Sequence, residues 1–127
     1  MSMTLNSTLL IQLLSVASGA ALGAMARFAI TSFIVSGAWG IFTVNVVGSF
    51  GFGLALGALI ASSPNAKLFW LTGFLGALTT FSSYIFEIHH FATPTVQWKA
   101  LLFFVVGQHV LGILFFILGL WLAKNTF

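Results

Sequence analysis

The sequence predicts an all-α, polytopic membrane protein that crosses the bilayer four times. Two features of its composition indicate this class: 60% of the 127 residues are hydrophobic, whereas only 4% are charged. Soluble domains contain about 25% charged residues, so the chain cannot cover a water-facing surface, and a soluble globular enzyme is excluded. The absence of cysteine excludes disulfides and thiolate metal sites. The few basic residues are spread along the chain, so no nucleic-acid partner is expected.

Four apolar segments are long enough to span a bilayer, which requires about 20 residues per helix. They cover about residues 9–35, 40–61, 68–91 and 100–123 and leave little sequence outside them. The intervening loops contain proline, glycine or serine, and tryptophans lie close to the expected membrane faces. We therefore expect a single membrane domain over residues 1–127, embedded in the lipid bilayer.

The first segment carries one charged residue, Arg27, about six residues beyond its middle, or roughly 9 Å along the helix. Either this side chain extends to the membrane surface, or its charge attracts anions into a vestibule. Gly19 and Gly23 form a small-xxx-small pair, which predicts close packing against another helix. A cleavable signal peptide is the alternative for this segment, but no basic residue precedes its apolar run.

The second segment contains Asn45 and Ser49, which are four residues apart and therefore lie on one helical face. An asparagine amide offers two N–H donors without a charge, which suits contact with an anion in a low-dielectric site. The alternative is that Asn45 forms a hydrogen bond between helices. Gly53 and Gly57 form another small-xxx-small pair and predict helix packing.

The third segment is the richest in polar residues, because four of the five residues at 79–83 carry hydroxyl groups near its midpoint. Serine and threonine compete for backbone carbonyls, and Gly73 and Gly76 precede the run, so we expect the helix to break there. Unwound backbone at this depth is tolerated where it is buried in protein or lines an aqueous path, and freed carbonyls can bind a small cation. The alternative is that the hydroxyls bond to the preceding turn and join helices.

Two more residues of this segment need a separate explanation. Phe81 is flanked by hydroxyl residues at the expected break, and the positive edge of its ring can help to solvate an anion; otherwise it is apolar bulk. Glu87 is the only acidic residue of the chain. With His90 it matches the Glu-x-x-His spacing of di-metal helix bundles, which need further carboxylates, so a catalytic metal site is not expected.

The fourth segment contains two polar residues, Gln108 and His109, whose purpose the pattern leaves open. The charges outside the segments are nearly balanced across the membrane. Lys67 and Lys124 fall on one side, and Lys99 falls on the other, with Arg27 towards it. Because loop charge sets orientation, this balance predicts insertion in both orientations and an antiparallel dimer.

Three stretches together carry a family resemblance. Residues 18–28 (SGAALGAMARF) are similar to GGxxGAxxRY, and residues 43–50 (TVNVVGSF) are similar to xVNxxGSF. Residues 73–84 (GFLGALTTFSSY), followed by Glu87, are similar to GxxGGLTTFSTF…E. These are motifs of the small fluoride channels known as the Fluc or CrcB family, which the chain resembles over nearly its whole length. Only the fourth segment lacks a clear match.

The resemblance implies a dual-topology homodimer in the plasma membrane of a bacterium or other microbe, with a broken third helix and two antiparallel fluoride pores. It implies a sodium ion at the dimer interface, held by the backbone carbonyls of Gly76 and Thr79, and a vestibule charge at Arg27. The residues implied along the fluoride path are Asn45, Phe81, Ser83, Tyr84 and Gln108.

This sequence departs from the family pattern at several positions. Tyr84 stands where the family usually has phenylalanine, and Ala77 replaces a glycine. Ile41 stands where threonine is common, and Gln108 falls about where the fourth helix usually carries a serine. The natural partner of the chain, an identical copy or a drifted paralogue, stays open.

We therefore expect a passive fluoride channel, not an enzyme, that exports cytoplasmic fluoride and confers fluoride resistance. The first alternative is a proton-coupled multidrug exporter, which needs a carboxylate deep in the membrane, whereas Glu87 lies near a helix end. The second is a non-transporting subunit of a membrane complex, in which the hydroxyl cluster at 79–83 has no evident use.

Overall fold

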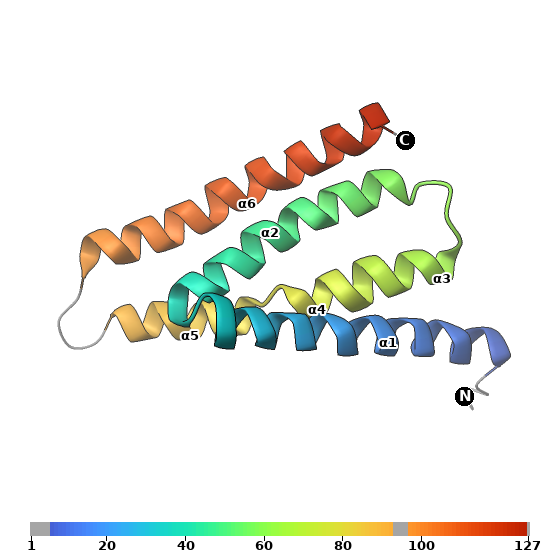
Figure 1. The fold of residues 1–127 in the computed structure, drawn as a ribbon, viewed down its shortest axis with the longest axis horizontal. Coiled ribbons are helices and arrows are strands. Elements are labelled where there is room, and N and C mark those ends of the chain that lie inside the picture. The colour runs from blue at the N-terminus through green and yellow to red at the C-terminus, as the bar shows by residue number, and fades with distance from the viewer. Residues whose placement is uncertain (1–5, 93–96, 127) are drawn as a thin grey trace, which may run out of the picture.

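The computed structural model describes residues 6–92 and 97–126, and every regular element in these ranges is helical. Four helical spans are long and apolar enough to cross a membrane, which confirms the predicted number of crossings. They lie side by side in the order fourth, second, third, first, and the first and last described residues lie at the same end (Figure 1). The four spans are Ser7–Ile34, Gly37–Ala58, Pro64–Phe91 and Trp98–Thr126.

Two of these spans, the first and the third, consist of more than one element. The first is α1 (Ser7–Ala29) followed by the π-helical turn η1 (Ile30–Ile34). The second is α2 (Gly37–Ala58), and the fourth is α6 (Trp98–Thr126). The elements of the third span are α3 (Pro64–Lys67), the π-helix η2 (Leu68–Leu75), α4 (Gly76–Leu78) and α5 (Phe81–Phe91).

The turn between the first two spans is shorter than the sequence indicates. Gly37 has a φ of 64°, a conformation that glycine adopts readily, and α2 begins there instead of near residue 40. Gly40 lies against the Val35 carbonyl oxygen, where a Cβ would overlap it, so the corner closes tightly. The expected loop between the third and fourth spans falls mainly on residues 93–96, which lie outside the described residues.

Glycines bring the spans together in two pairs. In the pair α2–α6, Gly53 lies against the Phe116 carbonyl and Gly119 against the Phe50 carbonyl, with no room for a Cβ at either glycine. In the pair formed by α1 and η2, Gly23 lies in the same way against the Phe74 carbonyl. The close packing predicted for these small-residue pairs is confirmed, and it fixes the second and third spans relative to their neighbours.

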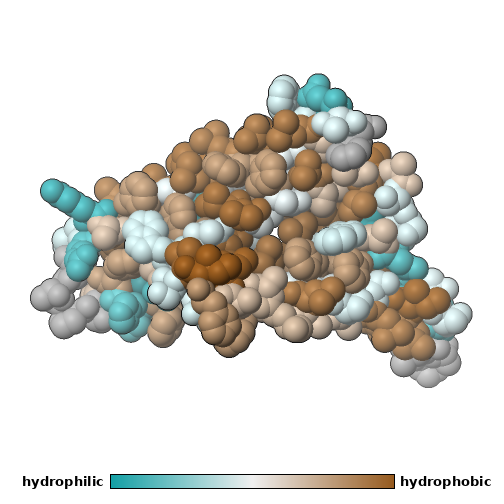
Figure 2. Space-filling view, viewed as in Figure 1, coloured by the Kyte–Doolittle hydropathy of each residue, from teal (hydrophilic) through white to brown (hydrophobic). Residues whose placement is uncertain are grey.

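Apolar side chains cover most of the outer surface. Figure 2 shows hydrophobic residues over the middle of one face and hydrophilic ones towards its ends, as expected for a chain surrounded by lipid. The buried core is small and lies at one end, around Phe104, which is 0% exposed, with Ile41 and Tyr84. The interior of this single chain therefore holds few side chains, and many of its large apolar residues are exposed.

Candidate functional site

The third span is interrupted between α4 and α5, where Thr79 and Thr80 have extended backbone conformations. The break predicted at this position is therefore present. A break releases backbone N–H and C=O groups, which must find other partners if they are buried.

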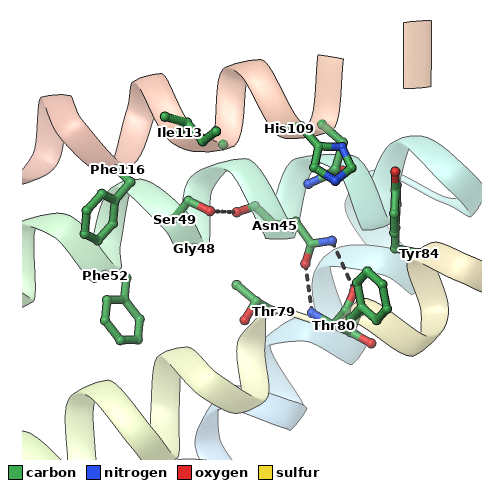
Figure 3. A pocket seen from close by; sticks show the side chains of 13 residues that line it. Asn45, Gly48, Ser49, Phe52, Thr79, Thr80, Tyr84, His109, Ile113 and Phe116 are labelled. Atoms are coloured by element: carbon green, nitrogen blue, oxygen red, sulfur yellow. Dashed lines mark hydrogen bonds between the residues drawn. The ribbon is translucent and has the colours of Figure 1, made fainter. Parts of the chain in front are cut away.

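Asn45 of α2 pairs with both backbone groups of Thr80. Its Nδ2 donates to the Thr80 carbonyl oxygen at 3.1 Å, and its Oδ1 accepts from the Thr80 N–H at 2.8 Å (Figure 3). The asparagine amide thus replaces the helical partners that Thr80 has lost. One N–H of the same amide is left over for another acceptor.

Arg27 of α1 reaches the break from the other side. Its Nη1 donates to the Thr79 carbonyl oxygen at 3.4 Å. A charged donor strengthens such a contact relative to a neutral one. The guanidinium is therefore directed at the break. The sequence leaves two roles for it, extension to the membrane surface and attraction of anions into a vestibule.

The hydroxyl groups of the break are bonded locally. The Thr80 hydroxyl accepts from Ser83 N–H at 3.3 Å, which caps α5, and donates to Ser83 Oγ at 3.1 Å. The Thr79 hydroxyl donates to the Leu75 carbonyl oxygen of the preceding turn at 3.0 Å. Thr79 thus follows the alternative given for the hydroxyl cluster, in which a hydroxyl bonds to the preceding turn, whereas Thr80 and Ser83 form a cap.

A cavity of ≈ 480 Å³ lies beside the break, between α2, α5 and α6. Its lining contains amide, hydroxyl, imidazole and aromatic groups but no acidic side chain, lysine or arginine. Of the residues predicted for the site, it contains Asn45, Thr79, Phe81, Tyr84 and Gln108. Ser83, Arg27 and Gly76 are not part of the lining; Ser83 and Arg27 instead contact the backbone or side chains of the break.

Two aromatic residues of α5 flank this cavity. The ring centroids of Phe81 and Tyr84 are 5.9 Å apart, with an angle of 40° between the planes. Tyr84 is 4% exposed and packs on Phe104, whereas Phe81 is 72% exposed in the single chain. Phe81 is therefore not core bulk, because little of its ring is covered by its own chain.

Two buried polar atoms at the cavity have no hydrogen-bond partner among the described residues. They are the hydroxyl oxygen of Tyr84 and Oε1 of Gln108. A buried group without a partner costs about 1–3 kcal/mol, so each such group calls for an explanation. The Tyr84 hydroxyl can donate to an anion or a water molecule inside the cavity, and the Gln108 amide brings both donors and an acceptor.

His109 also lines the cavity, although the sequence alone leaves its purpose open. Its ring lies 5.8 Å from the Tyr84 ring, at an interplanar angle of 72°. The signal available in the sequence is its spacing: His109, Gly112, Ile113 and Phe116 share one face of α6, and all of them line the cavity.

Comparison with known proteins identifies the family. Residues 14–120 match the family described as CrcB-like protein, Camphor Resistance (CrcB). The chain belongs to the CrcB family. The resemblance seen in the three motifs is thereby confirmed.

Curated relatives of this CrcB chain cover nearly its whole length. It is 40% identical over 126 residues, 92% of this chain and 94% of the relative, to "Fluoride-specific ion channel FluC" of Hydrogenovibrio crunogenus. It is 34% identical over 123 residues, 91% of this chain and 95% of the relative, to "Fluoride-specific ion channel FluC 1" of Carboxydothermus hydrogenoformans. A shorter match, 50% identical over 74 residues, joins 58% of this chain to 68% of "Fluoride-specific ion channel FluC 1" of Corynebacterium glutamicum. The chain is accordingly a multi-pass membrane protein.

The backbone of this CrcB chain has oxygen atoms that suit a small hard cation. The Thr80 N–H, which a continuous helix would bond to the Gly76 carbonyl, is bound to Asn45 instead. The Thr79 carbonyl loses the Ser83 N–H in the same way, because that N–H bonds to the Thr80 hydroxyl. Within the described ranges no cluster of three or more His or acidic side chains could hold a metal. The carbonyl oxygens of Gly76 and Thr79 are ligands of the kind that sodium prefers.

Proposed function

We propose that this chain is a passive, fluoride-specific ion channel of a bacterial plasma membrane and not an enzyme. Its family supports this function, and so do its relatives. They are named fluoride-specific ion channels, and the chain matches them over most of their length. The observation that carries the proposal is the cavity beside the helix break. It combines uncharged hydrogen-bond donors with aromatic rings and contains no lysine or arginine.

The chemistry of the cavity suits a small anion that must lose most of its water. The Tyr84 hydroxyl has no partner among the described residues, and the Asn45 amide retains one N–H, so both can donate to fluoride. The edge of the exposed Phe81 ring carries positive charge and can replace further water molecules. Gln108 extends this polar lining onto α6, and Ser83 supports it through the Thr80 cap.

Export needs no energy source other than the membrane potential. Fluoride enters a cell from acidic surroundings as neutral HF and is trapped as the anion after ionisation. A potential that is negative inside then drives the anion out through a selective pore, which confers fluoride resistance. Arg27, directed at the break, would raise the local concentration of anions near the pathway.

We further propose that the working unit is an antiparallel homodimer with a sodium ion at its centre. The nearly balanced loop charges permit both orientations, and a second copy would cover the exposed Phe81 beside the cavity. The carbonyls of Gly76 and Thr79 would hold the sodium, which supplies a fixed positive charge between the broken helices. The Thr79 carbonyl has two lone pairs, so it can accept from Arg27 and still act as a ligand.

The proton-coupled exporter is not supported by the placement of the single acid. Such a carrier needs a carboxylate facing a substrate chamber, and Glu87 is not part of the cavity lining. We therefore retain the channel as the one proposed function.

Fluoride release from liposomes tests the channel directly. Purified protein is reconstituted into vesicles loaded with potassium fluoride, and a fluoride electrode follows release after valinomycin is added. Rapid release that requires both the protein and valinomycin is expected, with protein-free vesicles as the control. Vesicles loaded with potassium chloride should release little chloride. Absence of fluoride release, or equal chloride release, would refute the proposed function.

An orientation-locking experiment tests the antiparallel dimer. Two lysines added beside Pro64 should fix one orientation, because loop charge sets topology. This variant should be inactive when it is expressed alone in a fluoride-sensitive strain, and co-expression with a variant locked by two lysines beside Lys99 should restore resistance. Resistance from either locked variant alone would rule out the antiparallel assembly while leaving the channel function intact.

A further inference from the structure

The imidazole ring of His109 lines the same cavity as Tyr84 and Asn45 (Figure 3). It lies on the face of α6 that lines the cavity, one turn before Gly112. A Cβ at Gly112 would be 3.7 Å from Ser49 Oγ, an ordinary contact, so this face of α6 lies next to α2. Neither the motifs nor the relatives' names assign a role to His109.

The hydrogen bond of His109 to its own helix fixes its neutral tautomer. Nδ1 lies 2.7 Å from the Val105 carbonyl oxygen. That oxygen has no proton to give, so Nδ1 must carry the hydrogen and donate it. In the neutral ring Nε2 is then a bare acceptor. Because Nδ1 faces the backbone of α6, the Nε2 edge faces away from it.

We infer that His109 is an anion-recognition group of the fluoride path that operates only when its imidazole is protonated. The neutral ring presents the lone pair of Nε2, which repels an anion. Protonation places a hydrogen on Nε2 and a positive charge on the ring, so the same edge donates to fluoride. This inference rests on the proposed function and adds a specificity-determining residue to it.

The surroundings of the ring leave this charge without a carboxylate partner in the lining. From α5, Tyr84 is in ring contact with His109, whereas Glu87 lies one turn further and outside the cavity lining. The whole of α2, Gly37–Ala58, contains no ionisable side chain. On α6 itself, Lys99 and Lys124 are more than two turns away on either side. The other charged group at the site, Arg27 of α1, is directed at the Thr79 carbonyl.

Histidine is the side chain whose charge ordinarily changes between about pH 5 and 8. Acidic conditions are also those under which HF enters cells and fluoride accumulates. A protonated His109 stabilises the anion where it has lost most of its water, which lowers the barrier to permeation. Fluoride flux should therefore increase as the pH on both sides of the membrane falls.

The test compares fluoride release by the parental protein, His109→Gln and His89→Gln. Glutamine keeps a polar side chain but does not titrate, and His89 is exposed near the end of α5, outside the cavity. Release is measured in symmetric buffers at about pH 7.5 and about pH 5.5, and HF leakage from protein-free vesicles is subtracted at each pH. We expect release by the parental protein and His89→Gln to increase about fivefold, equivalent to about 1 kcal/mol at the barrier.

His109→Gln should release fluoride at a rate that does not respond to pH. The same increase in His109→Gln, or a flat or falling rate in the parental protein, would overturn the inference while leaving the channel function intact. No release by the parental protein at any pH would instead refute the proposed function itself.

Imidazole NMR gives a second test that does not depend on transport or on the folding of a His109 variant. In an isotope-labelled His89→Gln and His90→Gln background, the neutral His109 signal should be that of the Nδ1–H tautomer. Added sodium fluoride should shift the signal at the lower pH and leave it unchanged at the higher one. A neutral Nε2–H tautomer, or no response to fluoride at low pH, would contradict the inference.

Discussion

The α2–α6 pair and the pair formed by α1 and the third span use the same packing device but differ in continuity. Both place glycines directly against the carbonyl groups of the neighbouring helix. The first pair consists of uninterrupted helices, Gly37–Ala58 and Trp98–Thr126. The third span instead passes through a π-helix and then breaks at Thr79 and Thr80.

The difference lies in what satisfies the backbone. In α2 and α6 each helix bonds its own backbone, so glycine contacts are enough to hold the pair. At the break, side chains from two other helices form hydrogen bonds with the backbone: Asn45 from α2 and Arg27 from α1. The continuous pair is thus a scaffold, and the broken span is the part whose shape depends on polar partners. Substitutions that disturb the glycine contacts of the scaffold, or that remove a polar partner of the break, should affect folding. Substitutions of side chains that only line the cavity should affect transport.

The largest effect is expected in the scaffold, for Gly119→Ala. Alanine normally favours a helix over glycine by about 1 kcal/mol. At Gly119, however, the new Cβ would overlap the backbone of α2 at Phe50, and backbone cannot move aside as a side chain can. We expect little or no folded protein in detergent size-exclusion chromatography.

Gly112→Ala is the matched control, because a Cβ there meets Ser49 Oγ at an ordinary 3.7 Å. This variant should fold like the parental protein. Equal yields of the two alanine variants would contradict the view that α2 and α6 are held by close backbone contact.

Asn45→Leu should produce the next largest effect, on stability. Leucine has a similar volume but leaves both the N–H and the C=O of Thr80 without their partner. Two unpaired buried groups should lower the free energy of unfolding by about 2–6 kcal/mol. Chemical unfolding in detergent measures this loss.

Asn125→Leu provides the same substitution at an exposed position near the end of α6, where the amide bonds only to the Trp121 carbonyl of its own helix. It should change the free energy of unfolding by less than about 0.5 kcal/mol. A similar loss in both variants would show that the clamp on Thr80 contributes nothing specific.

Phe81→Ile separates transport from stability at the break. Isoleucine keeps an apolar side chain but removes the positive ring edge. Because Phe81 is 72% exposed in the single chain, packing within the chain should change little. Loss of about 3 kcal/mol at the barrier would slow fluoride release roughly a hundredfold.

Phe74→Ile is the control on the other side of the break, where the ring packs on Trp70 at 5.5 Å, away from the cavity beside the break. Its release rate should stay close to the parental one. Fluoride release by folded Phe81→Ile at the parental rate would remove the aromatic ring from the pathway.

The sequence was sufficient for features that depend on local composition. Four spans follow from apolar length, and the break follows from hydroxyl residues after Gly73 and Gly76. The packing of Gly23 and Gly53 follows from small-residue spacing. In each case the cause lies within a few neighbouring residues, so it can be read without knowing the fold.

Features that depend on distant residues were not predictable in the same way. The sequence leaves two roles for Asn45, contact with an anion or a hydrogen bond between helices. The structure shows the hydrogen bond: Thr80, 35 residues away, occupies its oxygen and one of its donors. The π-helical turns η1 and η2 have no signal in the apolar pattern. The sequence shows only that His109 is a polar residue in an apolar segment, and the packing of α6 against α2 and α5 places it in the cavity.

The smallest and most specific effect is expected for Tyr84→Phe, which removes one oxygen atom from the break region. Because the Tyr84 hydroxyl is buried and has no partner in the part of the chain that the structure describes, its loss should leave the free energy of unfolding unchanged or raise it by about 1 kcal/mol. If the hydroxyl donates to fluoride, release should slow about fivefold, which corresponds to about 1 kcal/mol at the barrier. Stability and transport should thus change in opposite directions, unlike Asn45→Leu, which weakens the fold. The phenylalanine ring preserves the contact with His109, so the increase in flux at low pH should persist. Parental or faster release by Tyr84→Phe would show that the hydroxyl is not part of the fluoride path.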